Sequence, residues 1–89
     1  MNRYFTTRAD KEYKDWQKNN INVFCKINDI ADSIEEHGML GGIGKPEQLR
    51  HYEIPTFSRA ITKGDRLVYR PHSESDLLII SCKGHYGDK

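Results

Sequence analysis

The chain has 89 residues, a formal net charge of +1 and a hydrophobic fraction of 36%, which together fit one small globular domain over residues 1–89. Its longest uninterrupted apolar run, Leu77–Ile80, is far shorter than the roughly 20 residues that a membrane-spanning helix needs. The polar first residues lack the apolar stretch of a signal peptide. We therefore expect a soluble, cytoplasmic protein with no membrane partner.

Two amphipathic helices are predicted in the first 40 residues. Thr7–Asp10 has the pattern of a capping box, and Tyr13 and Trp16 lie three residues apart on one face of the helix that follows. Asn19-Asn20 interrupts this helix and can cap a second one, which Gly38 ends. The second helix has an apolar stripe at three- and four-residue spacing, formed by Val23, Phe24, Ile27, Ile30, Ala31 and Ile34. The two helices are expected to form a hairpin.

Extended segments account for most of the remaining chain. A short one is expected at about Tyr4–Thr6, and a glycine-rich loop over residues 39–46 leads to four more. These four are Gln48–Tyr52, Phe57–Thr62, Arg66–Arg70 and Leu77–Lys83. Their short connections favour antiparallel pairing. The predicted fold class is α+β, with the N-terminal helical hairpin packed on one face of a twisted antiparallel β-sheet.

The two cysteines, Cys25 and Cys82, are too few and too far apart in sequence for a disulfide framework. We expect both to be buried, reduced thiols that behave as small apolar residues. Cys82 and His85 have the spacing of two metal ligands, but no second pair completes the four ligands of a structural zinc site. No metal and no cofactor are therefore predicted.

Positive charge is concentrated in the middle of the chain. Between Gly44 and Arg70 there are six Lys or Arg residues against three Asp or Glu, so this segment carries +3. Tyr52, Phe57 and Tyr69 are interleaved with these cations. Such a composition suits RNA, whose phosphates attract cations and whose bases stack on aromatic rings. A mildly basic solvated face has the same composition, so composition alone leaves both interpretations open.

Four short motifs are more specific than the composition: Gly44–Leu49, Phe57–Arg59, Asp65–Tyr69 and Cys82–Tyr86. In this order and at this spacing they resemble the YoeB/Txe family of toxin ribonucleases, which belongs to the larger RelE-like group. Trp16 in the first predicted helix is similar too. The resemblance extends over nearly the whole chain and implies the RelE-like toxin fold.

The resemblance implies the toxin component of a type II toxin–antitoxin system. Such toxins are endoribonucleases that cleave messenger RNA on the bacterial ribosome without a metal ion. The ribose 2′-hydroxyl attacks the adjacent phosphorus and leaves a cyclic phosphate and a free 5′-hydroxyl. The implied partners are messenger RNA, the ribosome and a co-expressed acidic antitoxin of the YefM/Axe kind. A monomer and a homodimer are both compatible with the resemblance.

Roles for individual residues follow from the same resemblance. Glu47 matches the family's general base and His85 its general acid, a role that suits an imidazole titrating near neutral pH. Arg66 matches the phosphate-binding arginine, whose planar guanidinium can hold two phosphate oxygens. Tyr86 matches an aromatic residue that stacks on a base or bonds to phosphate. Further basic positions expected to bind substrate are Lys45, Arg50 and Arg59.

The chain departs from the family pattern at two places. Many members have two consecutive arginines where this chain has Arg59-Ala60, and many end at His-Tyr, whereas Gly87-Asp88-Lys89 follow here. A second hypothesis is therefore an RNA- or ribosome-binding module of the same fold with weak or lost cleavage. A third is an unrelated α+β interaction protein whose motif matches are coincidental.

Overall fold

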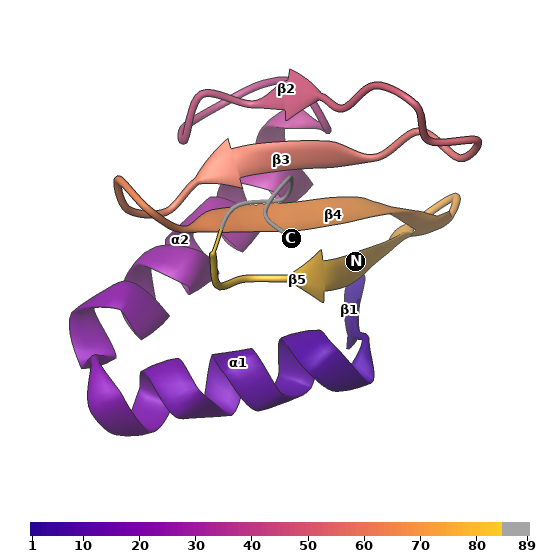
Figure 1. Ribbon diagram of the computed structural model, residues 1–89. Helices are drawn as coiled ribbons and strands as arrows, with labels where there is room; N and C mark the ends of the chain where they lie inside the picture. The colour runs from indigo at the N-terminus through magenta and orange to yellow at the C-terminus, as the bar shows by residue number, and fades with distance from the viewer. Residues whose placement is uncertain (85–89) are drawn as a thin grey trace.

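A computed structural model describes residues 1–84 of the chain (Figure 1). One strand precedes two consecutive helices, and four strands follow them. In chain order the elements are β1 (Asn2–Phe5), α1 (Thr7–Asn19), α2 (Ile21–His37), β2 (Glu47–Gln48), β3 (Phe57–Ala60), β4 (Arg66–Ser73) and β5 (Asp76–Ser81). None of the helices in this part of the chain is long and apolar enough to cross a membrane.

The strands form one sheet in the order β1-β5-β4-β3-β2. From β2 to β5, each strand pairs antiparallel with the next, as predicted from the short connections. The sheet is nevertheless mixed, because β1 pairs parallel with β5, with Tyr4 beside Leu78. Both helices and three strands separate β1 from β5 in sequence, so no short turn forces these two strands to be antiparallel. The predicted helical hairpin on one face of the sheet is confirmed.

Both helices begin at polar caps. Thr6, rather than the predicted Thr7, caps α1: its hydroxyl accepts from Ala9 N at 3.0 Å and donates to Ile80 O at 2.7 Å. Asn20 caps α2 as predicted, accepting from Val23 N at 3.3 Å. The cap at Thr6 thus joins the start of α1 to the last strand, since one hydroxyl serves both.

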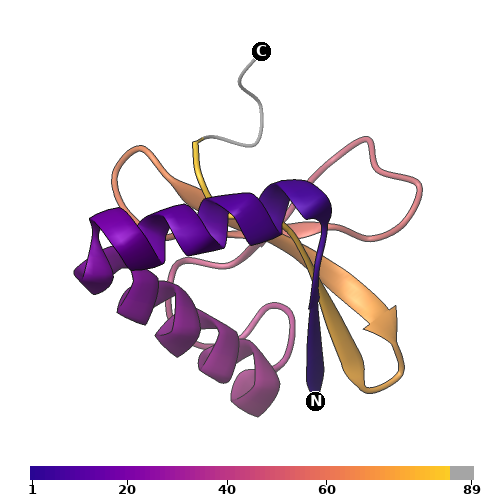
Figure 2. The same cartoon turned by 90° about the horizontal axis from the view of Figure 1, so that it is seen from below.

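The core lies between α2 and the sheet, and Figure 2 shows α2 on one side of the sheet with α1 running past its edge. Buried residues of α2 pack against Phe57, Leu67, Tyr69 and Ile79. Because side chains alternate between the two faces of a strand, the residues immediately before and after these positions face away from α2. On β4 this second group includes Arg66. No helix among the described residues covers this second face, which we call the open face of the sheet (Figure 1).

The two cysteines differ in their surroundings, which corrects the expectation that both are buried. Cys82 is fully buried and its thiol lies 3.7 Å from Ala9 O. Cys25 is exposed, because it lies two positions beyond the buried Val23 on α2 and so faces away from the core. Burial, reinforced by the negative charges of Glu12 and Asp65, raises the pKa of Cys82 to about 12.

We expect N-ethylmaleimide to label Cys25 alone in the native protein at neutral pH and both cysteines after unfolding in urea. The reagent attacks the thiolate. The raised pKa keeps the Cys82 thiol protonated, and its burial keeps the reagent from reaching it. Peptide mass spectrometry over a time course measures the two rates separately. Labelling of Cys82 as fast as Cys25 in the native protein would contradict the packing of β5 against α1.

Candidate functional site

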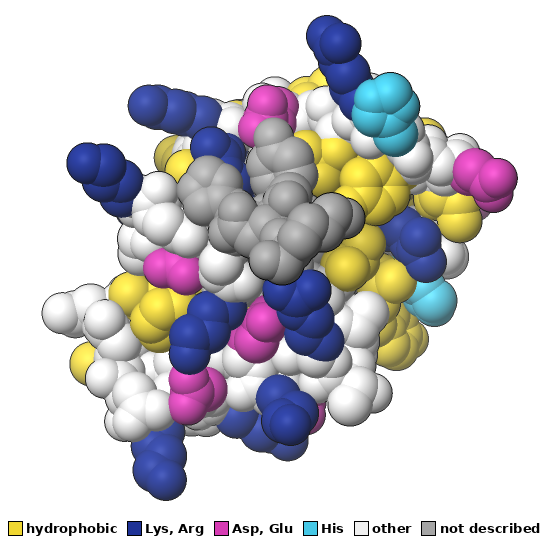
Figure 3. Space-filling view, in the orientation of Figure 1, with side chains coloured by type: hydrophobic (Ala, Val, Ile, Leu, Met, Phe, Trp, Pro, Cys, Tyr) yellow, Lys and Arg dark blue, Asp and Glu magenta, His cyan; other side chains and the backbone are white. Residues whose placement is uncertain are grey.

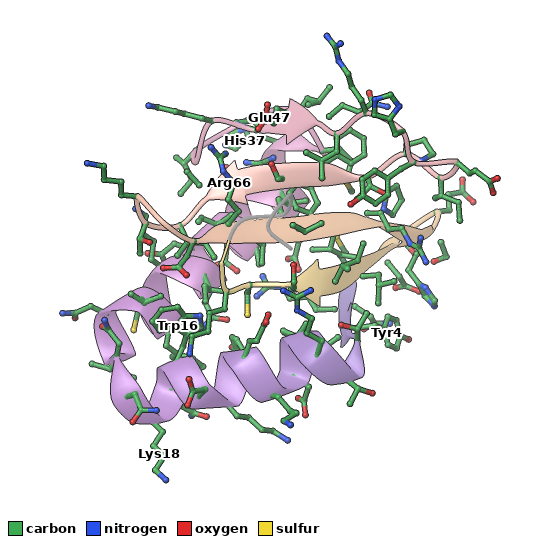
Figure 4. The ribbon with its side chains drawn as sticks, viewed as in Figure 1. Tyr4, Trp16, Lys18, His37, Glu47 and Arg66 are labelled. Carbon is green, nitrogen blue, oxygen red and sulfur yellow. The ribbon has the colours of Figure 1, made fainter. Side chains whose placement is uncertain are left out.

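Two of the predicted catalytic side chains meet on the open face of the sheet (Figure 4). Glu47 lies on β2 and Arg66 begins β4, with β3 between them in the sheet. Glu47 Oε1 is 3.5 Å from a terminal nitrogen of Arg66. Arg66 is paired across the strands with Ala60 and Glu47 with Ser58, and these two small residues leave room for the guanidinium to cross β3.

Both members of this pair remain accessible to a ligand. The Glu47 side chain is 47% exposed and the Arg66 side chain 27%. The hydroxyl of Ser58, a fully buried residue, also donates to Glu47 Oε1 at 3.4 Å. The carboxylate is therefore held from two directions. Sequence reasoning did not select Ser58, although the alternation of faces along β3 could have placed it beside Glu47.

The last described residue lies beside the start of β4. Arg66 N donates to Gly84 O at 3.0 Å, and Gly84 N donates to Asp65 Oδ1 at 2.8 Å. The predicted general acid His85 and the predicted aromatic contact Tyr86 lie outside the described residues. Gly84, which precedes them in sequence, is thus hydrogen-bonded to the backbone of Arg66, the candidate phosphate-binding residue.

Arg59 does not fit the predicted role in substrate binding, because it is 0% exposed. Its guanidinium donates to Tyr69 Oη at 2.8 Å and to the carbonyl oxygens of Ile43 at 2.9 Å, Gly38 at 2.8 Å and Met39 at 3.3 Å. Alternation along β3 turns this side chain toward α2 instead of the open face. The charge lies at the C-terminal end of α2, where the helix dipole favours a cation. Arg59 is therefore a structural residue.

The other cations of the basic segment remain on the surface. Lys45, Arg50 and Lys63 are exposed, and Arg66 and Arg70 are partly so. Figure 3, which views the open face, shows Lys and Arg side chains around its margin, with Asp and Glu side chains among them, mainly in the lower half of the view. The predicted substrate contacts Lys45 and Arg50 both flank β2, the strand that carries Glu47. The exposed cations on either side of β2 are thus suited to an anionic ligand.

Two helices packed on a mixed five-stranded sheet are the fold of the YoeB/RelE-like toxins. A family model described as the YoeB-like toxin of bacterial type II toxin–antitoxin systems matches residues 5–86. The chain belongs to this family, and the resemblance inferred from the four sequence motifs is confirmed.

Individual relatives agree with this assignment. Toxin YoeB from Escherichia coli is 39% identical over 75 residues, covering 84% of this chain and 87% of the relative. Toxin YoeB from a Synechocystis species is 38% identical over 82 residues, covering 92% and 93%. The structure of a YoeB dimer from Staphylococcus aureus superimposes with a TM-score of 0.90 at 40% identity, covering 97% of this chain and 98% of the other.

Proposed function

We propose that this toxin is an endoribonuclease that cleaves messenger RNA on the translating ribosome by metal-independent acid–base chemistry. The observation that supports this most directly is the Glu47–Arg66 pair, 3.5 Å apart and partly exposed on the open face of the sheet. A carboxylate beside a guanidinium provides a proton acceptor next to a phosphate-binding group. Membership of the YoeB-like toxin family agrees with this chemistry.

Glu47 and Arg66 act on the two adjacent groups of the RNA that start the reaction. Arg66 donates hydrogen bonds to the oxygens of the scissile phosphate, and its charge stabilises the negative charge that grows in the phosphorane. Glu47 takes the proton of the ribose 2′-hydroxyl as that oxygen attacks phosphorus. Because the carboxylate lies beside the guanidinium, a phosphate held by Arg66 brings the ribose on its 3′-oxygen side, which carries the attacking 2′-hydroxyl, toward Glu47.

The second half of the reaction needs a proton donor for the leaving group. The new bond joins the 2′-oxygen to phosphorus, and the bond that breaks joins phosphorus to the 5′-oxygen. We assign His85 as the acid that protonates this 5′-oxygen and Tyr86 as a residue that stacks on a base or bonds to phosphate. Both assignments rest on the family motif Cys82–Tyr86. Lys45 and Arg50 are assigned to hold the RNA on either side of β2.

The proposed partners are an acidic antitoxin of the YefM kind and a second copy of the toxin. Staphylococcus aureus YoeB has been solved as a dimer and in a heterotetrameric complex with YefM. In both structures the matched chain is 40% identical to this one. Exposed Lys45, Arg50 and Lys63 offer charge complementarity to a disordered acidic segment that folds on binding. Such a segment would cover the cations that the RNA needs.

Single-turnover cleavage of a message on programmed ribosomes, with mapping of the new ends, tests the proposed function. A cyclic phosphate and a 5′-hydroxyl are the expected products. We expect Arg66→Ala to lower the cleavage rate on the order of 10²-fold, the usual loss for one oxyanion-stabilising donor. Arg66→Lys should lose less, because it keeps the charge but not the two-pronged geometry.

Arg50→Ala is the matched control for the Arg66 variants, because it removes an exposed arginine that lies outside the pair. It should weaken binding of the ribosome more than it slows the chemical step. Native circular dichroism is required of all three variants. Equal cleavage rates for Arg66→Ala and Arg66→Lys would argue against a bidentate phosphate contact. Binding of ribosomes without cleavage by the wild type would favour the alternative, a binding module of the same fold.

A further inference from the structure

Cys82 and Gly84, which follow β5, are held by side chains from elsewhere in the fold. Cys82 N donates to Glu12 Oε1 at 2.8 Å, and Cys82 O accepts from Trp16 Nε1, also at 2.8 Å. Both side chains come from α1. The backbone of Cys82 therefore has both of its polar groups satisfied by one helix, although it lies beyond the last strand.

The β3–β4 turn holds the next part of this segment through Asp65. Asp65 Oδ1 accepts from Gly84 N at 2.8 Å, and Asp65 Oδ2 accepts from the Thr62 hydroxyl at 2.6 Å. The following residue, Arg66, donates its backbone N–H to Gly84 O at 3.0 Å. Two adjacent residues thus bind both polar groups of Gly84, while Thr62 orients the carboxylate.

We propose that Asp65 is a positioning residue for RNA cleavage, holding Gly84 in a fixed register against Arg66. This inference rests on the proposed function, in which Arg66 binds the phosphate and the residue after Gly84 delivers the proton. A general acid must come within hydrogen-bond distance of the leaving oxygen. A displacement of about 1 Å can cost as much as 10²-fold in rate. The adjacent residues Asp65 and Arg66 thus connect the phosphate-binding guanidinium with the chain segment that leads to the proposed proton donor.

The start of β5, beside the turn from β4, contains a matched control. Asp76, the first residue of β5, accepts from the hydroxyl of Ser73, three residues before it, at 2.8 Å, as Asp65 does from Thr62. Its Oδ1 accepts from the backbone of β1, at Asn2 N. Asp76 therefore makes the same local hydrogen bond as Asp65 but lies beside the other end of β4. It separates the effect of losing a turn carboxylate from the effect of releasing Gly84.

The test compares Asp65→Ala, Asp65→Asn and Asp76→Ala as purified full-length proteins. We expect Asp65→Ala to cut programmed ribosomes 10- to 100-fold more slowly in a single turnover, the range for a misplaced catalytic group. Its affinity for ribosomes and its melting temperature should match those of Asp76→Ala. Asp65→Asn should recover to within about threefold of the wild type, because its amide oxygen can still accept from Gly84 N. Asp76→Ala should cut at the wild-type rate.

Amide hydrogen exchange at Gly84 gives a readout that does not depend on cleavage. Exchange should be at least tenfold faster in Asp65→Ala than in the wild type and unchanged in Asp76→Ala. Wild-type cleavage by Asp65→Ala, equal losses in the two alanine variants, or no rescue by asparagine would each overturn the positioning role. A wild-type protein that does not cut at all would instead overturn the proposed function, even if the exchange data showed Gly84 held by Asp65.

Discussion

His85→Gln is expected to cut a message on programmed ribosomes at least a hundredfold more slowly than the wild type. The 5′-alkoxide is a poor leaving group, and the loss of a general acid typically costs on the order of 10²–10⁴ in rate. Glutamine keeps the size and the hydrogen-bonding capacity of histidine but cannot deliver a proton. Binding of ribosomes and antitoxin should therefore stay normal, and single-turnover kinetics isolates the chemical step.

Two further measurements make the His85 result specific. Deletion of Gly87-Asp88-Lys89 should leave the cleavage rate unchanged or raise it, because the family motif ends at Tyr86. The pH profile of the wild type should lose its limb on the basic side in His85→Gln, since that limb reports loss of the acid's proton. Cleavage by His85→Gln at the wild-type rate would mean that the proton comes from another group, and the assignment of the acid would be wrong.

Local patterns in the sequence were sufficient to predict most of the fold. The apolar stripe of α2, the cap at Asn20 and the stop at Gly38 are all set by residues close together in the chain. The direction of β1 was not predictable in this way. Its partner β5 lies more than 70 residues later, as the pairing of Asn2 with Asp76 shows, and no local signal reports so distant a contact.

The candidate site shows the same limit at the level of single residues. Glu47 and Arg66 were identified by motif order, and the register of three strands brings them together. Arg59 belongs to the same motifs, but one position along a strand decides whether an arginine faces RNA or the core. No sequence pattern singles out Asp65, because its contact with Gly84, 19 residues away, depends on the sheet being formed.

Arg59→Ala is expected to destabilise the protein by about 3 kcal/mol or more, the cost of stripping donors from several partly buried acceptors and leaving a cavity. The substitution removes the donor from the carbonyls of Gly38 and Ile43 and from the hydroxyl of Tyr69. A domain of this length has a total stability on the order of 5–13 kcal/mol. The substitution therefore consumes a large share of it, and the melting temperature should fall by roughly 12 °C or more.

Neighbouring contacts explain why the chain cannot relax around a smaller residue at position 59. The loop after α2 folds back over this side chain, with Ala60 N donating to Gly44 O at 2.7 Å. A Cβ placed on Gly44 would already lie 3.1 Å from Arg59 Cβ. Tyr69 is also committed, since its hydroxyl donates to Met39 O at 2.7 Å while it accepts from Arg59. This loop leads into β2 and Glu47, so its loosening should lower cleavage as well.

Urea unfolding followed by the fluorescence of the single tryptophan, Trp16, measures the effect of Arg59 on the free energy of unfolding. Arg59→Lys should fall between the wild type and Arg59→Ala, because an ammonium keeps the charge but cannot reach the same set of acceptors in one plane. Arg50→Ala, at an exposed position, should lie within about 0.5 kcal/mol of the wild type. If Arg59→Ala proved as stable as Arg50→Ala yet bound RNA poorly, Arg59 would be a substrate contact after all, and the buried network would contribute nothing to the fold.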